Sequence, residues 1–246
     1  MSEKGNDHIK IAYVTTVDST IRFLLLNCLH YLQRRGYQVC AICTPGPWAH
    51  EIEASGVQLL PVSLSRRVDP LSDVVPLLRL THLFRREGVH VVHTHTPKAN
   101  LLGRLAARLA QVPVVCGTEH GFYFYNLVGW RRRFHLLSAR IGAACSDRVF
   151  LVNQDDVETA RREGIVPPGK LRYLAGGTGV DLERFRPHPD WRAAARRELG
   201  IDPHTPVVGI VARLVAEKGH REFLHMAARV KKRMPQVCFS ILGDGE

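Results

Sequence analysis

The segment VHVVHTHTPKANLLGRLAARLA, residues 89 to 110, decides the fold. It opens with Val89–Thr94, a valine-rich run that is typical of a β-strand. After a proline, Lys98–Gln111 shows the apolar spacing of a helix, and another β-rich run, Pro113–Thr118, follows it. A strand, a helix and a second strand in this order predict a parallel β-α-β unit.

The same alternation continues in both directions along the chain. Further strands are expected at Ile9–Thr16, Gln38–Thr44, Gln58–Val62, Arg148–Val152 and Leu171–Ala175, and further helices at Thr20–Arg35, Ala49–Ser55 and Leu71–Glu87. Glycine stands directly after each of these three helices, where it commonly ends a helix. Several strands are apolar on both faces, so the predicted fold class is α/β, with a parallel sheet covered by crossover helices.

The pattern changes beyond Leu182. The segment ERFRPHPDW carries two prolines and alternating charge, which favours a linker, and a short helix is expected at Arg192–Leu199. One more unit follows: strand Val207–Ala212, helix Gly219–Met234 and strand Gln236–Leu242. Because a doubly wound domain needs roughly 100 residues or more, we expect residues 1–187 to form one domain and residues 188–246 to hold a linker and the beginning of a second.

Composition narrows the class of protein. Lysine and arginine number 34 against 23 acidic residues, which gives a formal net charge of +11, and 45% of the 246 residues are hydrophobic. These values are typical of a basic globular protein and exclude a disordered or collagen-like chain. No stretch is apolar enough for a membrane span and the N-terminal residues lack the apolar core of a secretory signal, so a cytoplasmic protein is expected.

The cysteines and histidines give no sign of a zinc site. Cys40 and Cys43 are three residues apart on a predicted strand, so their side chains point to opposite faces, and no second pair accompanies them. His93 and His95 share one strand face but have no evident third ligand. We therefore expect no metal, and buried free thiols at Cys28, Cys40, Cys43, Cys116, Cys145 and Cys238.

A segment rich in arginine and aromatic residues, GFYFYNLVGWRRRFHLLSAR, occupies Gly121–Arg140. Arginines beside aromatic rings suit an anionic membrane surface, a phosphate-bearing ligand or a nucleic acid, and a loop leading into a helix with a solvated basic face is the alternative. No helix-turn-helix, zinc-finger or RNP pattern accompanies the charge, so no nucleic-acid partner is expected. The candidates for membrane contact are Trp130, Arg131, Arg132 and Arg133.

Polar residues follow the predicted strands at their carboxyl ends, where doubly wound folds bind ligands. His95 lies at one such end, and Lys98 opens the next helix, where it could help the helix amides to hold an anion. His120 in GTEHGF can donate to a substrate oxygen or move a proton near neutral pH. Arg213 and Lys218 in ARLVAEKGH flank a strand-to-helix turn, which suits a diphosphate, although a solvated turn is the simpler interpretation.

The motifs, in their order along the chain, resemble retaining glycosyltransferases of family 4, which have the GT-B fold of two facing Rossmann-like domains. The HTHTPKANLLGRLAARLA variant and TVDSTIRFLL further resemble members that build capsular or exopolysaccharide chains. The matching stretches extend from near residue 9 to the last residue: IAYVTTVDSTIRFLLLNCLHYLQRRGYQV, VVHTHTPKANLLGRLAARLAQVPVV, GTEHGF, GVDLERFRP and VVGIVARLVAEKGHREFLHMAARVKKRMPQVCFSILGDGE.

The resemblance implies transfer of a sugar, with retention, from a nucleotide-sugar donor to a glycan or polyprenyl-linked acceptor. It implies a cytoplasmic protein, peripheral on the inner face of the cell membrane, that needs no metal or other cofactor. His120 matches the family's active-site histidine. Arg213 and Lys218 match the pair that holds the donor diphosphate and stabilises the leaving nucleotide, which is electrostatic catalysis.

On the acceptor side the resemblance is less complete. The loop Thr15–Thr20 lies where the family has its acceptor-side loop, which makes Thr16 and Asp18 candidate acceptor contacts together with His95 and Lys98. Many members have Gly-Gly in that loop, whereas this chain has Val-Asp-Ser.

The family's acidic pair, whose second glutamate meets the donor ribose, is expected beyond Glu246. A chain cut short within its donor domain is therefore expected to have little transfer activity alone. Two alternatives stay open: a hydrolysing sugar-nucleotide 2-epimerase of the same fold, and a non-catalytic half-enzyme that docks on a membrane or on another glycosyltransferase.

Overall fold

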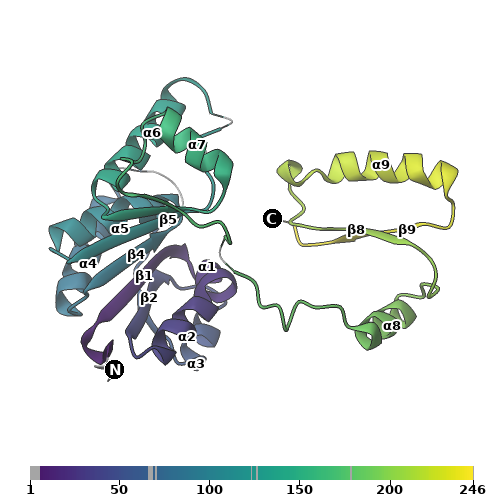
Figure 1. Cartoon of the computed structure of the whole chain (residues 1–246), viewed down its shortest axis with the longest axis horizontal. Coiled ribbons are helices and arrows are strands. Elements are labelled where there is room, and N and C mark those ends of the chain that lie inside the picture. Colours follow the sequence, from purple (N-terminus) through teal and green to yellow (C-terminus); the bar gives the residue numbers. More distant parts are fainter. Residues whose placement is uncertain are drawn as a thin grey trace. The chain divides into compact units, whose positions relative to one another are not determined.

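The computed structural model describes residues 6–65, 69, 71–122, 124–125, 127–177 and 179–245. The chain divides into two compact units, Met1–Gly179 and Val180–Glu246. This division falls a few residues before the predicted boundary at residue 187. Figure 1 shows the elements of both units along the chain.

A parallel sheet of seven strands forms the centre of the first unit, in the order β3-β2-β1-β4-β5-β6-β7. From β1 the chain builds the sheet outward to β3, and from β4 it builds outward in the opposite direction. The switch point of this doubly wound sheet therefore lies between β1 and β4, where such folds bind ligands. The strands are β1 (Lys10–Val17), β2 (Gln38–Thr44), β3 (Gln58–Pro61), β4 (Val91–His95), β5 (Val114–Glu119), β6 (Arg148–Leu151) and β7 (Leu171–Tyr173).

Helices cover both faces of the sheet (Figure 1). Alternate residues of β1 enter two different apolar cores, with Val14 on one face and Tyr13 on the other. Helices α4 and α5 pack on the Val14 face, and α2 and α3 pack on the Tyr13 face. The helices are α1 (Asp18–Thr20), α2 (Leu26–Arg34), α3 (Ala49–Ala54), α4 (Val74–Arg86), α5 (Pro97–Leu109), α6 (Gly129–Ala144) and α7 (Gln154–Arg162), with short turns η1 (Asn6–His8) and η2 (Ile21–Leu25).

The predicted α/β class with a parallel sheet is confirmed, and the differences lie in the helices. The helix expected at Thr20–Arg35 contains a π-helical turn, η2, between α1 and α2. Helix α7 was not predicted, and α6 was expected only in the alternative of a loop that leads into a helix; the two helices pack through Val157 and Leu136 onto the core beside β6 and β7. In α7 the apolar residues are few and surrounded by charge, and in α6 the exposed Leu137 and Ile141 blur the stripe formed by the buried residues, so the helical pattern is weak in the sequence.

All six cysteines are free. Cys40 and Cys43 lie in the cores on opposite faces of the sheet, as their spacing predicts, and burial raises the pKa of each thiol to about 12. The expectation that all the thiols are buried is wrong for Cys28, which is exposed, and Cys116, Cys145 and Cys238 are half-buried.

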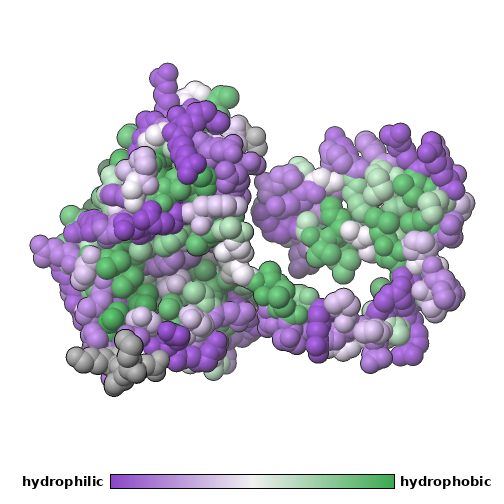
Figure 2. Space-filling view, in the orientation of Figure 1, coloured by the Kyte–Doolittle hydropathy of each residue, from purple (hydrophilic) through white to green (hydrophobic). Residues whose placement is uncertain are grey.

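The second unit is a small parallel sheet of β8 (Val207–Val211) and β9 (Cys238–Leu242), joined by η3 (Ala216–Lys218) and α9 (His220–Arg233) and preceded by α8 (Pro189–Glu198). It leaves much of its apolar surface in solvent: Val211 is 81% and Leu242 is 53% exposed. Hydrophobic residues are visible over this unit in Figure 2. Among its described residues, Ala227 and Val237 are the buried apolar ones.

In the part of the chain that is described, no helix has both the length and the apolar content needed to cross a membrane. Within the same residues, no three histidine, cysteine or acidic side chains are grouped so that they could hold a metal ion.

Candidate functional site

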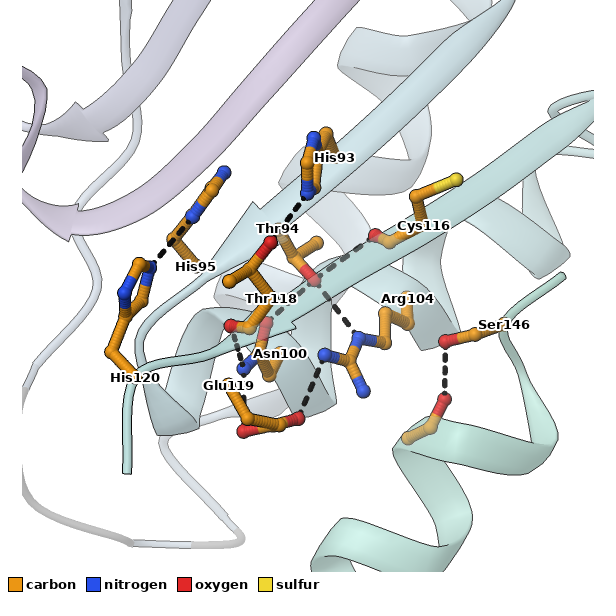
Figure 3. A network of polar contacts seen from close by, with 11 residues as sticks. His93, Thr94, His95, Asn100, Arg104, Cys116, Thr118, Glu119, His120 and Ser146 are labelled. Atoms are coloured by element: carbon orange, nitrogen blue, oxygen red, sulfur yellow. Dashed lines mark hydrogen bonds and ion pairs between the residues drawn. The ribbon is translucent and has the colours of Figure 1, made fainter. Parts of the chain in front are cut away.

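The carboxyl ends of β4 and β5 bring two predicted site residues together. His95 is the last residue of β4 and pairs in register with Thr118 of β5, so His120 lies just beyond it. The Nδ1 atom of His95 is 2.9 Å from Nε2 of His120, and the two rings stack with centroids 5.2 Å apart (Figure 3). The separate predictions for these two histidines therefore describe one contact.

A group of stacked rings surrounds His95. The ring of Tyr13 stacks on it at 5.4 Å and the ring of His93 lies 4.4 Å away. His93 Nε2 is itself 2.8 Å from the hydroxyl of Thr118. Three neighbouring strands, β1, β4 and β5, thus fix the orientation of the His95 ring.

Burial keeps the histidines of this cluster neutral. It lowers the pKa of His93 to about 3, and it holds the pKa of His95 well below the ordinary value of 6.5. The positive charge of Arg104 lowers both pKa values further. Burial also lowers the pKa of His120, against the opposing charge of Glu119. At neutral pH each ring therefore has one N–H donor and one acceptor nitrogen.

A buried ion pair supports the segment that carries His120. Arg104 of α5 is completely buried, and its Nη2 is 2.8 Å from Oε1 of Glu119 (Figure 3). Asn100 Nδ2 donates to the other carboxylate oxygen of Glu119 at 2.9 Å and to the carbonyl of Thr118 at 3.1 Å. Arg104 Nε also donates to Thr94 Oγ1 at 2.9 Å. Both carboxylate oxygens of Glu119, the residue before His120, are thus held by side chains of α5.

A strained threonine ties β1 to the same edge. Thr96, between β4 and α5, has φ 74° and ψ 144°, a conformation that is costly for any residue with a Cβ. Its hydroxyl is 2.6 Å from the hydroxyl of Thr16 and accepts from the Thr16 backbone N–H at 3.1 Å. Such strain is concentrated at functional sites, so Thr96 joins the predicted residue Thr16 in the candidate site.

Two of the predicted acceptor contacts have partners within the protein. Asp18 is buried, and its Oδ2 accepts from the backbone N–H of Trp48 at 2.8 Å, which ties the β1 loop to the β2 loop. Lys98 is also buried; its Nζ lies 2.6 Å from Asp73 Oδ1 and donates to Ser65 at 2.9 Å. The Lys98 ammonium is thus paired with a carboxylate of the protein itself. For both residues, contact with an acceptor stays a prediction.

The predicted membrane segment contains both exposed and paired side chains. Trp130 at the start of α6 is 73% exposed, and Arg131 lies over its ring at 5.7 Å. Arg133 is exposed as well, whereas Arg132 pairs with Glu163 at 2.7 Å and lies 5.9 Å from the ring of Phe124. Tyr123 and Asn126 of this segment lie outside the described residues.

In the second unit, the predicted cations meet at one carboxylate. Arg213 Nη2 is 3.1 Å and Lys218 Nζ is 4.0 Å from Oε1 of Glu217. The carbonyl of Arg213 is 2.8 Å from His220 Nε2, which ties the turn to the first residue of α9. A hollow of about 500 Å³ lies beside the turn, lined by Leu214, Val215, Ala216, His220, Arg221 and Glu222. The two cations are therefore spaced so that one anionic group can contact both.

Four residues of the site were not predicted from the sequence: Thr96, Asn100, Arg104 and Glu119. Asn100 and Arg104 lie four positions apart among buried leucines and alanines of one helix, a polar pair on an apolar face that could have been noticed. Glu119 directly precedes His120 in the sequence, and its negative charge is complementary to that of Arg104. The conformation of Thr96 had no signal, because threonine normally avoids positive φ.

Comparison with known proteins shows where the chain belongs. Residues 24–177 match the sequence model of a family described as "Glycosyl transferase 4-like domain". The chain is 30% identical to a UDP-Gal:alpha-D-GlcNAc-diphosphoundecaprenol alpha-1,3-galactosyltransferase of Escherichia coli, over 97% of this chain and 62% of that protein. It is 23% identical to the capsular polysaccharide biosynthesis glycosyltransferase CapM of Staphylococcus aureus, over 96% of this chain and 62% of CapM.

Among solved structures, Anabaena Alr3699/HepE in complex with UDP and glucose superposes with a TM-score of 0.74, at 16% identity over 97% of this chain and 62% of that one. An identity this low shows the fold alone. The chain thus spans 62% of the length of each of these proteins. The family match covers more than half of the chain and includes both His95 and His120, so the chain belongs to the family 4 glycosyltransferases and has the GT-B fold.

Proposed function

We propose that the protein containing this chain is a retaining glycosyltransferase that moves a sugar from a nucleotide-sugar donor to a glycan or polyprenyl-linked acceptor in cell-surface polysaccharide synthesis. The observation that carries the proposal is the neutral His95–His120 pair at the carboxyl ends of β4 and β5, beside the switch point of the sheet, in a chain that belongs to this family. The relatives support the substrate classes, because one is named for UDP-Gal and a diphosphoundecaprenol acceptor and the other for capsule synthesis.

In this proposal His120 contacts the transferred sugar. Its half-buried ring lies at the carboxyl edge of the sheet and is backed by His95 and by the Arg104–Glu119 pair. A neutral imidazole suits a neutral sugar, since it can donate to or accept from a hydroxyl without bringing charge to it. Of the predicted acceptor contacts, Thr16, Asp18 and Lys98 would then lie on the side of the sheet end that receives the sugar, and His95, which is buried, acts through its bond to His120.

Arg213 and Lys218 are proposed to hold the donor diphosphate. Both cations already converge on one oxygen of Glu217, and a diphosphate offers oxygens of the same charge. Two cations fixed beside a leaving group stabilise the negative charge that develops as the bond to the sugar breaks. On this basis the transfer requires no metal ion.

We propose further that residues 188–246 are the linker and beginning of a nucleotide-binding domain. The relatives are longer, and the exposed apolar residues of β8 and β9 suit a larger sheet. The 246-residue chain is then expected to turn over little donor alone. The exposed Trp130, Arg131 and Arg133 are proposed to contact an anionic membrane on its cytoplasmic side, where a polyprenyl-linked acceptor would be held.

The test begins with the gene beyond the codon for Glu246, so that the complete protein can be expressed. That protein is incubated with a panel of nucleotide sugars and a polyprenyl-diphosphate-linked sugar, and the product is analysed by mass spectrometry and by NMR of the new anomeric centre. Transfer with the donor's configuration retained, also in the presence of a chelator, supports the proposal. The 2-epimerase alternative predicts C2 epimerisation of the donor without an acceptor, and that result, or an inverted product, would overturn it.

A further inference from the structure

One hydrogen atom is shared between His95 and His120. The nitrogens that face each other, His95 Nδ1 and His120 Nε2, are 2.9 Å apart, a normal hydrogen-bond distance. Both rings are neutral in this cluster, so one of the two nitrogens carries the proton and the other accepts it. Which ring donates decides what His120 can offer to a ligand with its second nitrogen.

The other nitrogen of His95 settles the direction. His95 is 3% exposed, and its Nε2 is buried with no hydrogen-bond partner among the described residues. If His120 donated to His95, the proton of His95 would sit on Nε2, as a buried N–H with nothing to accept it. Orphaned buried N–H groups are rarer in proteins than acceptors with an unused lone pair. The arrangement with a bare Nε2 is therefore the favourable one.

Stacking holds the plane of the His95 ring, and a half-turn within that plane would break the bond of Nδ1 to His120. Tyr13 stacks on His95 with an interplanar angle of 16°, and His93 and His120 lie against it at 32° and 26°. Protonating both nitrogens is opposed by burial and by the positive charge of Arg104. His95 is thus held in one orientation and one charge state by β1, β4 and β5.

From this geometry we infer that His95 is a positioning residue that donates its Nδ1–H to His120 Nε2 and so fixes His120 with its own proton on Nδ1. The second nitrogen of His120 is then an N–H donor to the ligand. The identity of the ligand atom rests on the proposed function: it is an oxygen of the transferred sugar. His120 in this state is not a general base toward it. Free histidine favours the opposite tautomer, with the proton on Nε2, so the assigned state has to be imposed by the protein.

Long-range ¹H–¹⁵N NMR correlation on ¹⁵N-histidine-labelled chain measures this tautomer directly. The expected spectrum has His120 protonated at Nδ1 alone and His95 likewise, with assignments from His120→Gln and His93→Gln. A wild-type His120 protonated at Nε2 would overturn the inference. This reading needs no substrate, so it is independent of whether the proposed function is right.

Substitutions separate positioning from packing. His95→Asn keeps an N–H donor near the Nδ1 position, so His120 should keep its proton on Nδ1. His95→Phe keeps the stacking but removes the donor, so His120 should change to the Nε2 tautomer. His93→Gln is the matched control, because it alters the same cluster without removing the bond to His120. An unchanged His120 tautomer in His95→Phe would contradict the positioning role, and His95→Asn remains informative if the phenylalanine variant does not fold.

Kinetics of the complete protein provide the second readout. His95→Phe is expected to lower kcat by about tenfold or more, as loss of a tautomer-fixing partner does in other enzymes, with the KM for donor little changed. His95→Asn should restore most of kcat. A tautomer change without any loss of kcat would support the positioning of His120 while contradicting its proposed role in transfer.

Discussion

The guanidinium of Arg104 fills the space beside Gly117 that a side chain would need. A Cβ at position 117 would overlap the Nη2 and Cζ atoms of Arg104. Glycine in the middle of β5 therefore lets the arginine of α5 lie against the strand and reach Glu119 at its end. The position of His120 thus depends on a residue that has no side chain.

Replacing this glycine tests that dependence. Gly117→Ala should displace the Arg104 guanidinium and break its buried pair with Glu119, at a cost of about 2–4 kcal/mol in the free energy of unfolding. Urea unfolding followed by circular dichroism measures the loss. Gly169→Ala is the matched control, because a Cβ there meets nothing within 4 Å and its φ is ordinary. Equal stability of the two variants would mean that Arg104 can move aside without loss.

The neutral histidines make stability depend on pH. The pKa of His93 falls to about 3 in the folded protein, and that of His95 lies well below 6.5, because both rings are buried. As the pH falls below about 6.5 the unfolded chain takes up protons at these positions and the folded chain does not. Stability is therefore complete above that pH and declines by about 1.4 kcal/mol per pH unit for each of the two histidines.

Urea unfolding between pH 7.5 and 5 measures this decline, in a range where the acidic side chains stay ionised. His93→Gln should flatten the dependence by the share of one histidine, although it also lowers stability at neutral pH. His50→Gln, an exposed change on α3, serves as the control and should keep the wild-type slope. A slope unaffected by His93→Gln would assign the decline to other groups.

The sheet was predictable from the sequence because buried parallel strands must be apolar on both faces. Gln38–Thr44 was predicted with the limits that β2 has, and the strand around His93 to within two residues. Helix α7 was not predicted, because Val157 and Ala160 are nearly its whole apolar face. Burial on a small area leaves little periodicity to detect.

The sequence predicted only that the candidate site residues lie at the carboxyl edge of the sheet, and not which of them are in contact. Strand ends placed His95 and His120 near each other, but their contact depends on the register of β4 and β5 and on the ring orientations that stacking imposes. The partner of Lys98 could not be predicted from charge alone: a buried lysine needs a carboxylate, and Asp73, directly before α4, supplies it. Local sequence patterns do not predict which side chains from distant segments will be in contact.

The paired cations of the second unit offer a test of donor binding. In the complete protein, Arg213→Ala or Lys218→Ala should lower transfer by about a hundredfold or more, as loss of a charge that stabilises a leaving group does. Isothermal titration with the nucleoside diphosphate should show weaker binding in parallel. Arg229→Ala removes an exposed charge from α9 and is expected to change neither quantity. Wild-type transfer rates in both Arg213→Ala and Lys218→Ala would contradict the proposal that this turn binds the donor diphosphate.

The start of α6 can be tested as a membrane contact on the chain as it stands. Vesicles with anionic lipid should bind the chain in a flotation assay, more weakly as salt rises, because the attraction is between the basic segment and the lipid charge. Replacing Trp130, Arg131 and Arg133 together by alanine should lower the bound fraction about tenfold or more, since each basic residue near such a surface contributes about 1 kcal/mol.

The control for that experiment removes the same charge elsewhere. Arg34 and Arg35 are exposed at the end of α2, and their double alanine variant has the same net charge as the α6 variant. Arg132 is left in place in both, because its pair with Glu163 holds α6 against α7 and its loss would disturb the fold. If both variants lose binding equally, net charge and not the α6 surface attracts the chain to the membrane. If only the α6 variant loses it, exposed tryptophan and arginine at one helix start account for the attachment.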